Sequence, residues 1–391
     1  MLNLAKRMDQ LSTESAFEVL AKAKMLEAQG KDIVHLEIGQ PDFQTPINVC
    51  QAAFRAMKDG QTGYSSPAGL PAFREVVADW ISRTRGVSVQ PNQVTVTPGA
   101  KPIIFFTVLA CSDDGDEVIY PDPGFPIYES VINFAGAKPV PLPLKESVNF
   151  RFRIEDLEAR VSDRTRLLII NSPQNPTGSI LTQSDLEMIA ELATKHNFYV
   201  LSDEIYSQLV YDGAHQSILS IDGMQDRTIL LDGHSKSYAM TGWRLGYSVS
   251  TKLLADQFAK LMVNSNSCTA TFTQIAGIEA IQNSQDFVSQ MRLEFKTRRD
   301  FLVKGLNDID GLSCIMPSGA FYTFPNVTGI PMTCVDFSDY LLTEAGVALL
   351  PGSSFGMFGE GYIRMSYANS IDNIQEALSR IGNAISGVRS D

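Results

Sequence analysis

The sequence predicts an α/β protein with a large sheet-and-helix part followed by a smaller α+β part. Strand-like apolar runs alternate with loops and helix-like segments from Val94 to Tyr247, as expected for strands joined by helices in a mainly parallel sheet. The length of 391 residues exceeds one average domain. Beyond Gly319, short strand-like segments replace this alternation, which indicates a second unit of different architecture.

Composition and charge narrow the classes of protein to which the chain can belong. An apolar fraction of 44% with 19% charged residues is typical of a globular enzyme with a sizeable core. The formal net charge of -12 argues against nucleic acid or an anionic membrane as the main partner. No stretch approaches the roughly 20 apolar residues of a membrane span, and the N-terminus has no apolar core of the signal-peptide kind.

The cysteines and histidines indicate a reducing compartment and no metal. The five cysteines are odd in number and scattered, so we expect free thiols and a cytoplasmic location. The four histidines lack the spacing of metal ligands, so we expect no metal site.

The first 90 residues are expected to contain two helices and a strand. Residues 15–29 have the helical period, with a predicted apolar stripe formed by Phe17, Leu20, Ala21, Met25 and Ala28. A strand over 33–38 ends in a loop whose Gly39 would let the backbone approach a ligand, although an ordinary turn is the simpler explanation of this loop alone. A second helix has apolar residues at 73, 76, 77, 80 and 81, and Gly86 ends it.

The alternating region and the smaller part follow the same rules of periodicity. We predict buried strands over 94–97, 117–120, 166–170, 198–201 and 228–231. We predict helices over 102–111, 184–196, 254–262 and 282–306, the last long enough to bridge two domains. The smaller part is expected to contain strands over 319–324, 347–350 and 362–367 and a closing helix over 372–385.

Chemically useful side chains follow the ends of these strands, where open α/β sheets bind their ligands. Lys236 lies just past one strand, and Asp203 ends another, where a buried carboxylate needs a cation. Asn175 lies in a rigid loop, Phe125 follows a third strand, and the turn at Lys101 offers the free N–H groups of a helix N-terminus to an anion. Each feature alone has a simpler explanation as turn chemistry or core packing.

Taken together, these groups match the demands of pyridoxal phosphate. A lysine can form a Schiff base with its aldehyde, and an acid can keep its pyridine nitrogen protonated. A helix N-terminus with nearby cations, here Lys101 and Arg244, can hold the phosphate.

Five motifs carry a resemblance to a known family: SKSYAMTGWRLGY, NSPQNPTG, SDEIY, GYSSPAGLPAFRE and YIRMSYA. With them the chain resembles the class I/II aminotransferases, which are fold type I pyridoxal phosphate enzymes, and within these the bacterial aspartate aminotransferase branch. The resemblance implies a large domain whose mainly parallel seven-stranded sheet lies between helices, plus a smaller α+β domain. It implies an N-terminal segment over 1–45 that joins the small domain, a large cofactor-binding domain over 46–285, and a small domain over 286–391.

The resemblance also implies roles for residues around the cofactor. Lys236 would form the Schiff base and move the Cα proton, and Asp203 would keep the pyridine nitrogen protonated. Asn175 and Tyr206 would hydrogen-bond the ring's 3-oxygen, and Phe125 would stack on the ring.

Further residues are implied to hold the phosphate and the substrate. The residues expected around the phosphate are Ala100, Lys101, Ser235, Arg244 and Tyr64 of the partner subunit in a homodimer. Arg364 would bind the substrate α-carboxylate as a bidentate fork, with Asn175 beside it and Gly39 closing over it by its backbone.

The implied reaction is a ping-pong transamination between an L-amino acid and a 2-oxo acid. Aspartate, or another amino acid, with 2-oxoglutarate is the expected pair. A C–S β-lyase, or an aromatic or alanine transaminase, would use the same groups, so these alternatives stay open. The aminotransferase-like domain of a transcription regulator is disfavoured by the acidic charge.

Departures from the family pattern leave the side-chain preference open. Gly233 stands where many relatives have a phosphate-binding serine, and no arginine for a distal carboxylate occurs between Asn264 and Ile275. In the bacterial branch a lysine takes that role, and Lys101 occupies its place, although a phosphate or structural role is nearly as favoured. Leu11–Ser15 also departs from the usual lysine-proline-serine entry pattern of a segment that lines the substrate mouth in relatives.

Overall fold

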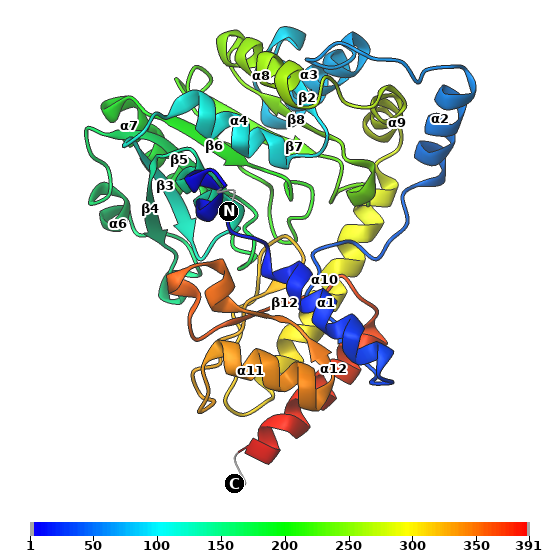
Figure 1. Ribbon diagram of the computed structural model, residues 1–391, viewed down its shortest axis with the longest axis vertical. Coiled ribbons are helices and arrows are strands. Elements are labelled where there is room, and N and C mark those ends of the chain that lie inside the picture. Colours follow the sequence, from blue (N-terminus) through cyan, green and yellow to red (C-terminus); the bar gives the residue numbers. More distant parts are fainter. Residues whose placement is uncertain (1–3, 389–391) are drawn as a thin grey trace.

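A seven-stranded sheet forms the centre of the larger part of the molecule (Figure 1) in the computed structural model, which describes residues 4–388. Its strands are β2 (Val94–Thr97), β3 (Glu117–Asp122), β4 (Lys138–Pro143), β5 (Thr165–Asn171), β6 (Tyr199–Asp203), β7 (Thr228–Gly233) and β8 (Gly246–Val249). They lie in the order β2-β8-β7-β6-β5-β3-β4, with β8 antiparallel to β2 and β7 and the other pairs parallel. The predicted α/β class with a mainly parallel seven-stranded sheet is confirmed.

Helices cover both faces of this sheet, because successive strand residues point to opposite sides. They are α3 (Pro71–Arg85), α4 (Lys101–Cys111), α5 (Ile127–Phe134), α6 (Ile154–Glu158), α7 (Gln183–His196), α8 (Lys252–Ser265) and α9 (Thr271–Gln282), whereas α2 (Ile47–Lys58) packs on α9. Leu167 and Ile169 of β5 share an apolar cluster with α4, α5 and α8, whereas Leu168 and Ile170 share one with α6 and α7. The sheet therefore has two apolar faces, and its strand ends are left for polar chemistry.

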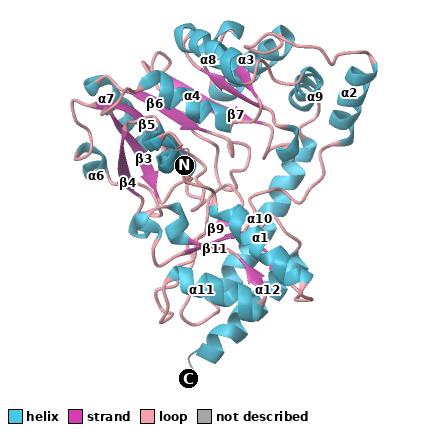
Figure 2. Cartoon of the chain, viewed as in Figure 1, coloured by secondary structure: helices cyan, strands magenta, loops and turns pink. Residues whose placement is uncertain are grey.

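The smaller part combines an early segment of the chain, which includes α1, with the C-terminal elements (Figure 2). Its strands are β1 (Val34–His35), β9 (Tyr322–Thr323), β10 (Val347–Ala348), β11 (Leu350–Pro351) and β12 (Ile363–Ser366), and its helices are α1 (Ser15–Ala28), α10 (Asp286–Asn307), α11 (Cys334–Tyr340) and α12 (Ile371–Val388). β1 pairs with β10, and a three-stranded sheet has the order β11-β12-β9. Figure 1 shows α10 running from the larger part down into the smaller one. The boundaries 1–45, 46–285 and 286–391 stay a prediction.

The predicted inward stripe of the first helix is wrong. Phe17 is 62% exposed and Met25 is 60% exposed, whereas Ala23 is fully buried. Ala23 belongs to a small cluster with Ile33 and Leu342, against which other α1 residues also pack. The buried face is thus set by the strand and helix on which α1 lies, and Phe17 is left at the cavity described below.

Other differences concern short or irregular elements. The strand predicted over 33–38 is paired only at Val34–His35, and the small-part strands are shorter than predicted. The helix predicted from residue 282 begins at Asp286, because Thr271–Gln282 forms a separate helix, α9. Sequence periodicity also missed α2, α5, α11, β4 and β8.

The described residues contain neither a membrane-spanning helix nor a metal-binding cluster, and their cysteines form no disulfide. Within residues 4–388, no helix is long and apolar enough to cross a membrane. In that same range, no group of three or more His, Cys, Asp or Glu side chains is arranged to hold a metal ion. All five cysteines are free thiols.

A buried ion network fixes the ends of β6 and β7. Arg85, at the end of α3, donates through Nε to Glu204 at 2.8 Å and through Nη2 to Asp232 at 3.4 Å. His215 also contacts Glu204, at 2.8 Å. Burial alone would raise the pKa of Glu204, but Arg85 and His215 bring it down to about 2, so this carboxylate stays ionised. Because Glu204 follows Asp203, the network holds the strand end from which Asp203 projects.

We predict that Arg85→Leu lowers the free energy of unfolding by about 3–5 kcal/mol, because it leaves the buried carboxylate of Glu204 without its cation. Urea denaturation followed by circular dichroism measures the change. The matched control is Arg83→Leu, which removes the exposed pair with Asp79 and should cost less than about 1 kcal/mol. Equal effects of the two substitutions would contradict the prediction.

Candidate functional site

A cavity of about 530 Å³ opens at the carboxyl ends of the parallel strands, between the large sheet and the smaller part. The predicted site residues that line it are Gly39, Ala100, Lys101, Phe125, Asn175, Asp203, Tyr206, Ser235, Lys236, Arg244 and Arg364. The predicted residue that does not line it is Tyr64, which is 92% exposed on the loop before α3. The volume of the cavity is that of a typical small-molecule site.

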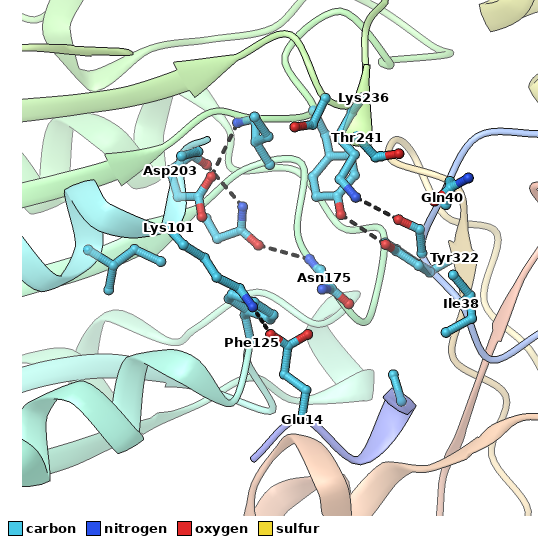
Figure 3. A pocket seen from close by; sticks show the side chains of 18 of the residues that line it. Glu14, Ile38, Gln40, Lys101, Phe125, Asn175, Asp203, Lys236, Thr241 and Tyr322 are labelled. Carbon is cyan, nitrogen blue, oxygen red and sulfur yellow. Dashed lines mark hydrogen bonds and ion pairs between the residues drawn. The ribbon is translucent and has the colours of Figure 1, made fainter. Parts of the chain in front are cut away.

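Lys236 lies in the loop that follows β7, and its amine points into the cavity (Figure 3). Nζ donates a hydrogen bond to the backbone oxygen of Gly39 at 2.6 Å. A Cβ at position 39 would collide with the hydroxyl of Tyr322, so this close approach of backbone and lysine needs glycine. Burial lowers the pKa of Lys236 to about 8, and the charges of Arg364 and Arg244 act in the same direction. About a tenth of this amine is therefore neutral and nucleophilic at pH 7, far more than for an ordinary lysine.

Asp203 ends β6 and is buried on the opposite side of the cavity from the small sheet. Its carboxylate accepts hydrogen bonds from the hydroxyl of Tyr128 at 2.6 Å and from the backbone N–H of Ile205 at 3.2 Å. Among residues 4–388, no Lys, Arg or His side chain forms an ion pair with it. Burial raises the pKa of Asp203 to about 6 despite these two hydrogen bonds. The site thus holds an acid that lacks a cationic partner of its own.

The N-terminus of α4 and Arg244 form a cationic corner of the same cavity. Gly99 has φ +85°, and a Cβ there would collide with the guanidinium of Arg244. Arg244 is held in the left-handed region, with Nη1 donating to the oxygen of Thr241 at 2.8 Å. Ser235 lines the cavity beside them. Free backbone N–H groups, a helix dipole and a guanidinium together suit an anion such as a phosphate.

Arg364 reaches the cavity from β12 of the small sheet, with its guanidinium 4.5 Å from the ring centre of Tyr322 and 4.9 Å from that of Phe355. Nη1 donates to Oδ1 of Asn175 at 3.1 Å, and Nη2 donates to the backbone oxygen of Glu37. Its buried Nε has no hydrogen-bond partner among the described residues. A buried donor without an acceptor is costly, so this guanidinium suits an incoming carboxylate.

Aromatic side chains shape the rest of the wall. The hydroxyl of Tyr206 lies 2.9 Å from that of Tyr322, and burial raises the pKa of Tyr206 well above its usual value, which keeps it a donor. The ring of Phe125 packs edge-on against Tyr128, with centroids 5.7 Å apart. Lys101 lies with Nζ 5.6 Å from the ring centre of Phe125.

Among the cavity residues that the sequence analysis did not assign to the site, Tyr128, Tyr322 and Glu14 contact predicted site residues through polar groups. Tyr128 and Tyr322 bond the functional oxygens of Asp203 and Tyr206, yet each lies in an apolar run that indicates core packing. Glu14 forms an ion pair with Lys101 at the mouth of the cavity. The departure of Leu11–Ser15 from the family pattern was the only available signal for Glu14.

The donor set fits pyridoxal phosphate. The amine of Lys236 suits an aldehyde, and the uncompensated carboxylate of Asp203 suits a protonated ring nitrogen. The corner formed by the α4 N-terminus, Ser235 and Arg244 suits a phosphate. A group with these three features would bring Asp203 the cation that no described Lys, Arg or His side chain supplies, and would place an anion at the α4 corner.

Comparisons with known proteins agree with this chemistry. Residues 31–381 match the family model described as Aminotransferase class I and II. The chain is 40% identical to the aspartate aminotransferase of Pyrococcus abyssi, covering 90% of this chain and 91% of that protein. It is 40% identical to aromatic-amino-acid aminotransferase 2 of Thermococcus litoralis, covering 90% and 92%. The solved structure of Thermus thermophilus aspartate aminotransferase with maleate superposes with a TM-score of 0.95 at 38% identity, covering 98% of this chain and 100% of that one.

We predict that Asp203→Asn stabilises the cofactor-free protein while it removes function. The pKa of Asp203 is about 6 in the folded state and about 4 in the unfolded state. Between pH 4 and pH 6 the folded state therefore binds more protons than the unfolded state, and the wild-type protein loses stability as the pH rises through this range. Urea denaturation at pH 8 should show a gain on the order of 2 kcal/mol, falling to about half at pH 5. A gain that is independent of pH, or a loss at pH 8, would contradict this explanation.

Proposed function

Since this chain belongs to the class I and II aminotransferases, we propose that it holds pyridoxal 5′-phosphate in the Lys236 cavity and transfers an amino group between an L-amino acid and a 2-oxo acid. It is a transferase enzyme. The observation that carries the proposal is one cavity that joins the amine of Lys236, the carboxylate of Asp203 and the Nε of Arg364; within the described part of the chain, that carboxylate has no ion-pair partner and that Nε has no hydrogen-bond partner.

Residues of the large sheet bind and orient the cofactor. Pyridoxal phosphate, when bound, supplies an electron-accepting ring that takes up the charge left when the substrate Cα loses its proton. The Asp203 carboxylate keeps the proton on the ring nitrogen, and Tyr128 orients that carboxylate. Asn175 and Tyr206 donate to the ring's 3-oxygen.

Further residues anchor the cofactor and pack against it. Backbone N–H groups of Ala100 and Lys101, with Ser235 and Arg244, bind the phosphate. Phe125 packs against the ring face.

Substrate handling falls to Lys236 and Arg364. Arg364 holds the α-carboxylate as a two-pronged donor, which fixes the amino acid in one orientation. Asn175 and the backbone of Gly39 lie beside it. Lys236 Nζ would take the Cα proton and return it to the C4′ carbon of the cofactor, acting in turn as base and acid, which its pKa of about 8 permits near neutral pH.

The wider setting of the enzyme is also part of the proposal. We place it in the cytoplasm as a homodimer with sites at the subunit interface, where Tyr64 of the partner subunit reaches the phosphate. The 92% exposure of Tyr64 outside its own cavity supports this arrangement. The free thiols of all five cysteines suit a reducing compartment.

The expected substrates are aspartate, or another amino acid, and 2-oxoglutarate. Relatives named for aspartate and for aromatic amino acids support this range. A half-reaction panel tests the function: single L-amino acids are mixed with the cofactor-loaded enzyme, and the absorbance of the amino form of the cofactor is followed. Conversion by one or more amino acids is expected. Catalytic release of ammonia and pyruvate without an oxo acid would instead indicate a β-lyase.

We predict that Lys236→Ala abolishes the half-reaction with every amino acid in the panel, because no other amine replaces the proton-transferring Nζ. Cofactor should still bind non-covalently through the α4 corner, as measured by equilibrium dialysis. Lys260→Ala, at an exposed lysine of α8, serves as the control and should keep full activity. Retained transamination by the Lys236 variant would refute its assigned role.

We predict that Arg364→Lys raises KM for the amino acid about 10- to 100-fold, because a single point charge replaces the guanidinium fork. Cofactor affinity should change less than about threefold. Steady-state kinetics and cofactor titration separate the two effects, and Arg292→Lys at an exposed site on α10 is the control. A loss confined to cofactor binding would show that Arg364 does not contact substrate.

A further inference from the structure

The cation expected to recognise the substrate side chain already has a carboxylate partner. Figure 3 shows Lys101 extending from the start of α4 toward Glu14, with which it forms an ion pair. Both residues line the cavity, and Nζ of Lys101 also lies above the ring of Phe125. A protein carboxylate thus pairs with Lys101, the candidate cation for a distal carboxylate of the substrate.

The local structure directs Glu14 into the cavity. Glu14 is the residue before the first turn of α1, and its side chain makes no capping hydrogen bond to that helix. The residues just before Glu14 contact the larger part of the molecule. The N–H of Ser12 donates a hydrogen bond to Oγ of Ser130 in α5, at 3.0 Å. An acidic group at a helix start normally favours the free N–H groups there. Here that side chain is turned toward Lys101 instead.

Glu14 also balances the charge of the cavity. In the proposed function, Arg244 faces the phosphate and Arg364 faces the α-carboxylate, which leaves the side-chain ammonium of Lys101 without an assigned ligand anion. The charge of Glu14 reaches beyond its own pair, because it partly offsets the lowering of the pKa of Lys236 and of Arg364. The carboxylate therefore acts on the substrate-binding end of the cavity as a whole.

We propose that Glu14 is a specificity-determining residue, an internal carboxylate that occupies Lys101 until an acidic substrate side chain displaces it. Amino acids with uncharged side chains bind with the Glu14–Lys101 pair intact, whereas dicarboxylic acids must first release Glu14. This inference rests on the proposed function, because it concerns the side-chain end of the same substrate site.

The energetics permit such an exchange. The side chain of Lys101 is 44% exposed and that of Glu14 is 17% exposed, so the pair is worth about 1 kcal/mol or less. A released Glu14 has a second favourable position at the free N–H groups of α1. Displacement of Glu14 from Lys101 therefore costs little free energy. We expect the pair to weaken the binding of dicarboxylic acids but not to prevent it.

Binding of two non-reactive ligands to the cofactor-loaded enzyme tests the proposal. Succinate carries two carboxylates, and succinamate has the same length with a neutral amide at one end. We expect Glu14→Gln to lower the Kd of succinate about fivefold and to change that of succinamate less than about twofold, by calorimetry. The double variant Glu14→Gln with Lys101→Gln should lose the gain. Glu18→Gln, at an exposed residue one turn along α1, should leave both Kd values unchanged.

Several outcomes would overturn the inference. An unchanged succinate Kd in the Glu14 variant, an equal change for both ligands, or loss of all binding would each do so. A gain that survives in the double variant would show that Lys101 is not the group released. The half-reaction panel judges the proposed function separately, because calorimetry measures ligand binding whether or not the enzyme transfers an amino group.

Discussion

A buried carboxylate without a cation is the constraint on which the site depends. Asp203 lies at the end of β6, where a tyrosine hydroxyl and one backbone N–H are its only hydrogen-bond partners among residues 4–388, and its ionised form is costly there. The neighbouring Glu204 solves the same problem internally, with Arg85 and His215. The two adjacent acids thus differ in their partners. Glu204 stabilises the fold through its ion pairs, whereas Asp203 can accept a ligand that carries a positive charge.

Much of the large part could be predicted from sequence because its strands are buried on both faces. Val94–Thr97 and residues 167–170 are continuous apolar or β-branched segments, and the strands predicted over 94–97 and 166–170 coincide closely with β2 and β5. β4 was not predicted, because its prolines at 139, 141 and 143 argue against a strand. These prolines are tolerated because β4 is an edge strand of the sheet. α9 escaped because it buries polar and apolar residues alike, including Gln274, so it has no apolar stripe.

The site was predictable to the extent that its residues lie in motifs at strand ends. Asp203 ends β6, Lys236 and Asn175 lie in the loops that follow β7 and β5, and parallel topology brings such strand ends together. Tyr128 and Glu14 reach the cavity only through tertiary packing: one from the inner side of α5, the other from an N-terminal segment that crosses to α4. No local pattern encodes such meetings.

Two separate sheets hold opposite sides of the expected substrate. Arg364 belongs to β12 of the three-stranded sheet, whereas Lys236 follows β7 of the seven-stranded one. Proton transfer is sensitive to position, and an error of about 1 Å can cost on the order of 100-fold in rate. The relative position of the two sheets is therefore expected to affect the rate of proton transfer. Substitutions along α10 or in the β1–β10 pair would alter turnover without touching any group that meets the amino acid.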